Sequence, residues 1–316
     1  MNKKMKIFIA GHTGLIGSAC ASHFMHRGYN NLITRSSNEL DLTNQVAVND
    51  FFAREKPEYV VLSAGKVGGI HMNMNTPASL MWTNLQIQNN VMHAARQHAC
   101  KRVIVFGSSC MYPKNAKQPM SELDLFSGKP EPSSLPYAIS KMAAVYLALA
   151  MNKEDDADRF IPLIPNSVYG ANDNFGPSMG HVLSALVARF SNAVENNLGS
   201  VTLWGSGQAR REFIFSEDLA SACLHLMFKD KIPLETPINI GTGYDISIRE
   251  LAEKIGYLTK FSGEIIWDTT KPEGSLQKLL DSSVINGLGW KPITSLDQGL
   301  KYTINWYQTN SGAHTK

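Results

Sequence analysis

Short apolar runs alternate with longer amphipathic segments over the first half of the chain. The runs are rich in β-branched and aromatic residues and predict strands at 6–11, 31–35, 59–65, 102–109 and 160–170. The segments between them have helical spacing and predict helices at 14–27, 44–56, 77–99 and 140–152. Continuous apolar strands separated by helices are typical of a parallel sheet covered on both faces. The pattern therefore predicts an α/β fold with a doubly wound parallel sheet.

The rhythm changes after residue 170. A stretch rich in glycine, asparagine and proline precedes further helices and short strands in an irregular order. We expect a smaller α/β lobe, interleaved with the first domain, that binds the substrate. The expected division gives 1–170 to the first domain, with about 213–243 returning to it, and gives 171–212 and 244–316 to the second lobe.

The composition and charge of the chain limit the classes of binding partner that we expect. The chain has 316 residues, 43% of them hydrophobic and 18% charged, and its net charge is +3 with scattered basic residues. A nucleic-acid partner is therefore not expected, and neither is a membrane, because no apolar run in the sequence reaches the ~18 residues of a spanning helix. The four cysteines form no CxxC pair, so no metal site is expected, and reduced thiols in the cytoplasm are the simplest interpretation.

The first predicted strand runs into the turn "GHTGLIG", which opens a helix. Glycines at this spacing let the backbone approach a pyrophosphate at the helix N-terminus, so the turn predicts a dinucleotide site. A purely structural turn is the alternative. The residues expected to contact the cofactor here are Gly11, Thr13, Gly14, Leu15, Ile16 and Gly17.

The second predicted strand ends in "TRSS", where an acidic residue would hold the ribose of NAD. Arg35, Ser36 and Ser37 stand there instead, and an arginine with hydroxyls suits the 2′-phosphate of NADP. The alternative is that Arg35 is a solvated loop cation, which would leave NAD possible.

The segment "PYAISK" places Tyr137 and Lys141 one helical turn apart. An ammonium beside a phenol is expected to lower the phenol pKa from ~10, so that the phenol can exchange a proton with a carbonyl oxygen. Ser108, at the end of an earlier strand, could hydrogen-bond the same oxygen. A solvated helix face is the alternative interpretation of the pair.

Three motifs in this order, "GHTGLIG", "GSSCMYP" and "PYAISK", resemble those of the extended short-chain dehydrogenase/reductases in the nucleotide-sugar epimerase and dehydratase branch. Further segments, among them "GKVGGI", "YGANDNFGPS" and "WGSGQARREF", resemble the GDP-L-fucose synthase family over nearly the whole chain. The resemblance implies a Rossmann domain, NADPH as cofactor, a GDP-sugar substrate and a homodimer. The implied reaction converts GDP-4-keto-6-deoxy-D-mannose to GDP-L-fucose by 3,5-epimerisation and 4-reduction.

The resemblance also implies catalytic roles. Epimerisation beside a ketone needs a base and an acid on opposite faces of the sugar, and thiol and imidazole pKa values, ~8.5 and ~6.5, suit these tasks. Cys110 is the implied base and His181 the implied acid. Tyr137 would protonate O4 during reduction, with Lys141 and Ser108 assisting. A packed thiol and a histidine at a helix start are the alternatives for the first two.

Further positions carry over from the family motifs. The implied substrate contacts are Ser109, Cys110, Arg189, Trp204, Arg211 and Glu273. The implied additional cofactor contacts are Phe106, Gly107, Ser108, Tyr137, Lys141, Pro165, Asn166, Ser167, Val168 and His181.

The chain departs from the family at Thr13 and Ser37, where arginines are common, and in "PNSVYG". Such drift is compatible with the same chemistry, or one of its steps, on a related GDP-4-keto sugar, such as a deoxyheptose or a colitose precursor. A catalytically silent dinucleotide-binding regulator is the hypothesis outside enzymes.

Overall fold

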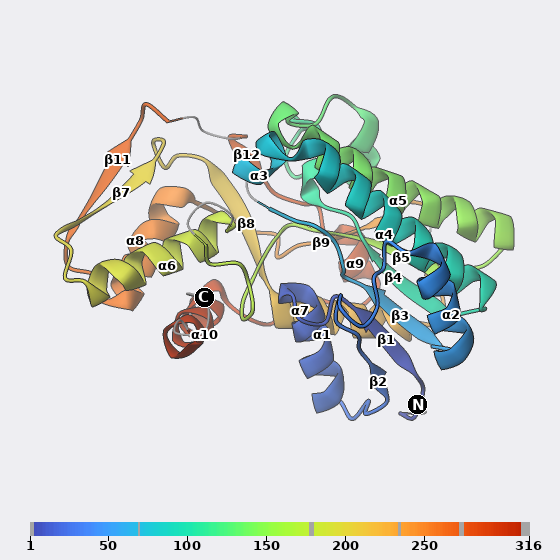
Figure 1. Ribbon diagram of the computed structural model, residues 1–316. Helices are drawn as coiled ribbons and strands as arrows, with labels where there is room; N and C mark the ends of the chain where they lie inside the picture. Colours follow the sequence, from blue (N-terminus) through green and yellow to red (C-terminus); the bar gives the residue numbers. More distant parts are fainter. Residues whose placement is uncertain (1–2, 69, 177–179, 233–234, 272–274, 311–316) are drawn as a thin grey trace.

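A six-stranded sheet in which all neighbouring strands run parallel forms the centre of the larger part of the molecule (Figure 1). This computed structural model describes residues 3–68, 70–176, 180–232, 235–271 and 275–310. In spatial order the strands are β2 (Leu32–Ile33), β1 (Ile7–Ala10), β3 (Tyr59–Leu62), β4 (Arg102–Phe106), β5 (Phe160–Pro165) and β9 (Ile238–Ile240). The last strand comes from the C-terminal half, so the chain returns to this sheet after leaving it. The predicted doubly wound parallel sheet is confirmed.

Helices cover both faces of this sheet because side chains alternate along each buried strand. Along β1, Ile7 and Ile9 pack into one hydrophobic cluster, and Phe8 and Ala10 pack into another on the opposite face. The helices of the first face are α1 (Leu15–His26), α7 (Ser216–Met227) and the short α9 (Ser283–Gly287). Those of the second face are α2 (Gln45–Glu55), α4 (Pro77–Gln97) and α5 (Leu135–Asp155).

The smaller part of the molecule has its own core and lies at the left of Figure 1. Its helices are α6 (Val182–Glu195), α8 (Ile248–Thr259) and α10 (Leu296–Asn310). Its strands are β7 (Ser200–Trp204) paired with β11 (Glu264–Asp268), and β8 (Arg210–Phe215) paired with β6 (Ser167–Tyr169), β10 (Asp245–Ser247) and β12 (Gln277–Lys278). β8 is therefore the strand on which segments distant in sequence converge.

The strand order places a ligand site. The chain passes from β1 to β2 on one side and then crosses to β3 on the other, and in such sheets ligands bind beyond the carboxyl ends of the strands at this switch point. The turn after β1, the start of the loop after β3 and the segment after β4 meet at this edge. The sequence motifs with candidate chemistry lie in or beside these connections.

Several elements differ from the predicted ones. β2 spans two residues rather than five, and short helices that carry no strong periodic signal interrupt the connections: α3 (Ile70–Asn75), η1 (Ser109–Met111), η2 (Glu122–Phe126) and η3 (Pro132–Ser134). Within the range expected for the second lobe, Ile285 and Trp290 pack in the core of the first sheet. Trp290 is fixed there by a hydrogen bond from its indole nitrogen to the Ser221 hydroxyl, 2.8 Å long.

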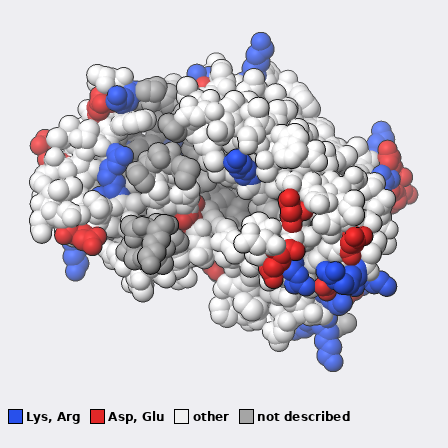
Figure 2. All heavy atoms as spheres, in the orientation of Figure 1, with Lys and Arg blue, Asp and Glu red and all other residues white. Residues whose placement is uncertain are grey.

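α5 (Leu135–Asp155) is longer than the helix predicted at 140–152. The stretch Pro132–Asp155 would be long and apolar enough to cross a membrane by length and composition alone. The helix packs against α4, β4 and β5, which accounts for its apolar face. Basic and acidic side chains are interspersed over the face of the molecule drawn in Figure 2.

Candidate active site

The glycine turn after β1 forms a cradle that side chains would fill. Gly11 has φ +84°, and a Cβ there would lie 2.7 Å from the backbone of Ala64. A Cβ on Gly17 would lie 2.1 Å from the carbonyl oxygen of Gly11. Gly14 is the N-cap residue of α1 and makes no side-chain cap, so the first N–H groups of the helix are left for another acceptor. Bare backbone at a helix N-terminus fits a dinucleotide pyrophosphate. The other residues expected to contact the cofactor in this turn, Thr13, Leu15 and Ile16, line it or follow it at the start of α1.

The polar groups expected to bind a 2′-phosphate already have partners. Arg35 forms an ion pair with Glu55 at 2.9 Å, and its other terminal nitrogen donates to the carbonyl of Thr34 at 2.7 Å. Ser36 donates from both its backbone nitrogen and its hydroxyl to the Glu39 carboxylate, each at 2.7 Å. Ser37 is exposed. A phosphate bound here would have to exchange with these carboxylates, which the sequence analysis did not foresee.

The motif "GSSCMYP" forms the end of β4 and the short helix η1. Phe106 ends the strand, and Gly107 packs so closely that a Cβ there would lie 3.0 Å from the Met111 and Val145 side chains. The Ser108 hydroxyl caps η1 by accepting from the backbone nitrogen of Cys110 at 3.2 Å. Ser109 is buried in η1. The cap turns the chain directly after the strand and places Cys110 at the carboxyl edge of the sheet.

Several polar groups face the Cys110 thiol, Ser108 from the same turn and the others from separate elements. The Lys278 ammonium of β12 lies 3.8 Å from the Cys110 sulfur. Burial raises the pKa of this thiol, but Lys278, a hydrogen bond with Ser108 and the charge of His181 outweigh burial, so the net pKa is lowered. The charge of Cys110 in turn acts on Arg211 of β8. The predicted base is therefore a half-buried thiol whose pKa is lowered by a neighbouring cation.

The expected lowering of the Tyr137 pKa is not observed. Burial and the neighbouring Cys110 raise the pKa of this phenol, although a hydrogen bond with Ser108 opposes them. Burial also lowers the pKa of Lys141 to about 8. The Lys141 ammonium lies toward Gly65, where a Cβ would be 3.7 Å from it. Tyr137 is therefore a neutral phenol in this structure, which suits a proton donor.

His181 has an acidic partner that the sequence analysis missed. The residue is the N-cap of α6, and its Nδ1 lies 3.6 Å from a carboxylate oxygen of Asp173. The interaction with Asp173 raises the pKa of the imidazole, whereas burial lowers it. Asp173 is itself buried and accepts a hydrogen bond from the Ser184 hydroxyl. The pair favours the protonated imidazole, the form needed in an acid.

The segment Pro165, Asn166, Ser167 and Val168 joins the two parts of the molecule, because β5 ends at the first and β6 begins at the third of these residues. The amide nitrogen of Asn166 donates to the buried Glu212 carboxylate at 2.6 Å, and its amide oxygen is buried with no hydrogen-bond partner. Glu212 also accepts from the backbone nitrogens of Thr242, Gly243 and Leu280. The unpartnered oxygen is available to a ligand at this edge.

The predicted substrate contacts divide into two groups. Arg211 shares the surroundings of Cys110. Arg189 lies in the second lobe, donates to the carbonyl of Thr202 at 2.7 Å and lines a cavity of about 440 Å³ between α6 and β7. Trp204 ends β7 with 64% of its surface exposed, and the Lys271 ammonium lies 5.9 Å from its ring centre. Glu273 lies outside the described residues.

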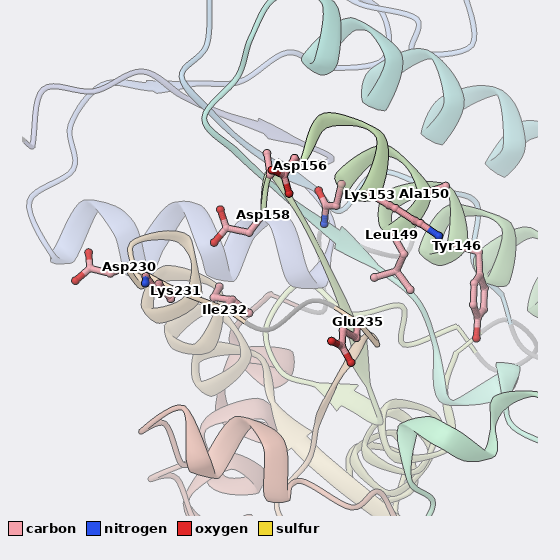
Figure 3. A pocket seen from close by; sticks show the side chains of 12 residues that line it. Tyr146, Leu149, Ala150, Lys153, Asp156, Asp158, Asp230, Lys231, Ile232 and Glu235 are labelled. Atoms are coloured by element: carbon pink, nitrogen blue, oxygen red, sulfur yellow. The ribbon is translucent and has the colours of Figure 1, made fainter.

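A larger groove, of about 1140 Å³, lies at the opposite edge of the sheet (Figure 3). It is formed by the C-terminal half of α5 and by the connections that precede β5 and β9. Its labelled side chains include carboxylates and lysines, for example Asp158, Asp230 and Lys231. These connections enter the strands at their amino ends, whereas ligands of open α/β sheets bind at the carboxyl ends. The candidate active site is therefore not this groove.

Three side chains that act on the predicted site were missed from the sequence: Asp173, Glu212 and Lys278. Each is ordinary in its local context, and each becomes significant through contacts with residues far along the chain. The signal that could have found them is their place inside recognised segments, namely "YGANDNFGPS", "REF" and the residues before "LLD".

The fold and this site define a nucleotide-sugar-modifying enzyme of the dehydrogenase/reductase class. Residues 7–241 match the model of the "NAD dependent epimerase/dehydratase family", and the chain belongs to that family.

Within the family, the chain is 45% identical to GDP-L-fucose synthase 1 of Arabidopsis thaliana, with 98% of this chain and 95% of that protein covered. It is 41% identical to GDP-L-fucose synthase of Escherichia coli, with coverages of 97% and 98%. Among solved structures, it is similar to the GDP-mannoheptose C4 reductase from Campylobacter jejuni with NADP bound. That similarity has a TM-score of 0.88 at 39% identity and covers 98% of this chain and 99% of the other.

Proposed function

We propose that this chain is an NADPH-dependent 3,5-epimerase and 4-reductase that converts GDP-4-keto-6-deoxy-D-mannose to GDP-L-fucose. The observation that carries the proposal is one cluster that joins a thiol beside a cation, an imidazole beside a carboxylate and a phenol hydrogen-bonded to Ser108. Two epimerisations and one reduction need these three groups. The similarity to the GDP-L-fucose synthases of A. thaliana and E. coli extends over nearly the full length of those proteins and supports the choice of substrate.

Epimerisation uses the thiol and the imidazole. The Cys110 thiolate removes the proton from a carbon beside the C4 ketone, and the electron pair of the broken C–H bond moves into an enolate. His181 then gives its proton to the same carbon from the other face, which inverts the centre. Exchange of one proton with solvent at each residue restores the pair for the second centre.

Reduction uses the phenol. Tyr137 gives its proton to O4 as the ketone becomes an alcohol, and Ser108, which is hydrogen-bonded to Tyr137, orients the phenol. When bound, NADPH would supply the hydride that C4 receives. The residues that would hold the cofactor are those of the glycine cradle, Gly11 to Gly17, with Arg35, Ser36 and Ser37 at the 2′-phosphate and Lys141 and Asn166 toward the reacting end. The C. jejuni reductase with NADP bound supports NADP over NAD.

The test is product analysis by NMR after incubation of the chain with GDP-4-keto-6-deoxy-D-mannose and NADPH in deuterated water. We expect GDP-L-fucose with deuterium at C3 and C5, and one NADPH oxidised per product. NADPH oxidation without deuterium at these carbons would reduce the function to the reductase step. Binding of NADPH without turnover would favour a silent regulator.

A second candidate has the same residues acting on another GDP-4-keto sugar, such as a deoxyheptose or a colitose precursor. It is favoured by the similarity to the C. jejuni heptose C4 reductase, whose chain is covered almost completely at 39% identity. Turnover numbers for the deoxymannose and heptose substrates, measured side by side, decide between them.

The assembly and location are part of the same proposal. The exposed apolar side chains of Trp82 on α4 and of Leu135 and Ile139 on α5 support a homodimer built on these two helices. Light scattering of Trp82→Glu against the unchanged chain tests the homodimer.

Four free cysteines support a location of the enzyme in the cytoplasm. The division into a cofactor domain and a substrate lobe is supported by the separate hydrophobic clusters of the two parts.

A further inference from the structure

Lys278 is the nearest cation to the Cys110 sulfur for which the structure gives a contact, at 3.8 Å. Nothing in the sequence motifs assigns it a role. It is neither adjacent to Cys110 in sequence nor on the same element, because 168 residues separate them. A lysine that meets a half-buried thiol from another part of the fold can act on its protonation through space.

The backbone holds Lys278 firmly. On one side, β12 pairs with β8, where Lys278 lies opposite Arg211. On the other side, the next two residues are bound to the loop after η1: Leu279 donates to the Gln118 side chain at 2.7 Å, and Leu280 forms a bridge with Met120. Leu280 is buried and also donates to the Glu212 carboxylate. The lysine is thus built into the seam between the two parts rather than placed on a free surface.

Other titratable groups face the thiol as well. His181 approaches from the start of α6, Arg211 from β8 and the neutral Tyr137 phenol from α5. Among the groups that lower the thiol pKa, Lys278 contributes most, ahead of Ser108 and His181. His181 cannot serve as the permanent counter-charge, since it gives up its proton in the proposed reaction. Lys278 has no proton-transfer role in that reaction.

We propose that Lys278 is the positioning residue that keeps Cys110 in its thiolate form. The thiolate is then ready to remove the protons beside the substrate ketone, and this catalytic part of the inference rests on the proposed function. In that step the proton passes from carbon to sulfur, and the lysine only loses its ion-pair partner while Cys110 is protonated. The ammonium therefore stabilises the base before the transfer and helps to expel the proton to solvent afterwards.

The experiment is the pH dependence of Cys110 alkylation by iodoacetamide in the full chain, followed by mass spectrometry of the Cys110 peptide. Cys20, Cys100 and Cys223 are buried, which separates them from the half-buried Cys110. We expect the alkylation midpoint of the unchanged chain to lie below the ordinary thiol value of ~8.5. Lys278→Met should raise the midpoint by about one unit and slow alkylation at neutral pH roughly tenfold.

Two further variants make the result decisive. Lys278→Arg keeps a cation and should keep the low midpoint, whereas Lys254→Met removes an ion-paired lysine of α8, bound to Asp297 at 2.7 Å, and should leave the midpoint unchanged. Coincident profiles for Lys278→Met and the unchanged chain would overturn the proposal. So would a Lys278→Arg profile like that of Lys278→Met, because shape rather than charge would then matter.

A substrate arm separates this inference from the proposed function. Lys278→Met should lose deuterium incorporation at neutral pH and recover it at higher pH, where the thiol ionises without help. If the unchanged chain incorporates no deuterium into the GDP-keto sugar, the proposed function fails, and the alkylation profiles still decide whether Lys278 controls the thiol.

Discussion

The two side chains proposed to move protons in epimerisation, Cys110 and His181, lie beside opposite charges. Cys110 lies 3.8 Å from the Lys278 ammonium, and His181 lies 3.6 Å from the Asp173 carboxylate. The cation lowers the pKa of the thiol, and the carboxylate raises the pKa of the imidazole. The two counter-charges thus favour the thiolate on the base side and the imidazolium on the acid side.

Burial alone would favour the uncharged form of both side chains. It raises the pKa of Cys110 and lowers that of His181, so that both groups would be neutral near pH 7. A neutral thiol is a poor base, and a neutral imidazole has no proton of suitable acidity to give. The difference between the two sides therefore indicates that the proposed epimerisation depends on the paired charges as well as on the thiol and the imidazole.

Replacement of the proposed base, Cys110, is expected to have the largest effect on the reaction. Cys110→Ser changes one atom and should preserve the fold, but a hydroxyl beside Lys278 stays protonated near neutral pH. We expect deuterium exchange into the keto sugar to fall roughly 10³-fold. Slow reduction of the unepimerised substrate should persist. Exchange at the unchanged rate would mean that the thiol is only a packed side chain. His181→Asn, by contrast, should allow exchange with retention of configuration.

The Tyr137 phenol sharpens the comparison because, in the part of the chain that the structure describes, no neighbouring cation lowers its pKa. Burial and Cys110 raise its pKa, so it should act only as a donor. Tyr137→Phe is therefore expected to slow NADPH oxidation by ~10²-fold or more while exchange beside the ketone continues within a few-fold. Parallel measurements of NADPH absorbance and deuterium content check this. Loss of both signals in a folded variant would contradict the division of labour.

The acid side can be weakened without removing the imidazole. Asp173 raises the pKa of His181, so the protonated form persists to higher pH than it would alone. Asp173→Asn should lower that pKa, and the fall of the exchange rate on the alkaline side should begin at lower pH. At mildly alkaline pH we expect a loss of about tenfold, corresponding to one pKa unit, and at mildly acidic pH nearly full activity.

Ser184→Ala is the matched control for this shift. It removes the hydrogen bond that the Ser184 hydroxyl donates to Asp173 and keeps the carboxylate, which still accepts from the backbone nitrogen of Asn174 at 2.8 Å. An alkaline limb that is unchanged in Asp173→Asn, or moved equally in Ser184→Ala, would show that the carboxylate does not set the protonation of His181.

The sequence predicts the half of the site that depends on local spacing. The glycine cradle, the Ser108 turn and the Tyr137–Lys141 pair each lie within one motif, and the alternating pattern gives the sheet that carries them. Lys278 and Asp173 could not be assigned in this way, since their effects arise where β12 and the loop before α6 meet the rest of the site. The pKa direction of Tyr137 was wrong for the same reason, because burial and Cys110 act on it through the tertiary structure.

The expected cofactor site contains a third charged pair, Arg35 and Glu55. Here the carboxylate does not adjust a pKa but competes with the 2′-phosphate for the guanidinium. Arg35 is bound to Glu55 at 2.9 Å, so a 2′-phosphate has to share or displace this carboxylate. We therefore expect Arg35→Ala to raise KM for NADPH only a few-fold and to leave KM for NADH nearly unchanged, because a partly exposed contact that is already paired is worth at most about 1 kcal/mol. Glu55→Gln frees the guanidinium and should lower KM for NADPH. Initial rates with both cofactors measure this. If NADPH and NADH are used equally by the unchanged chain, or if Glu55→Gln weakens NADPH, Arg35 does not contact the phosphate.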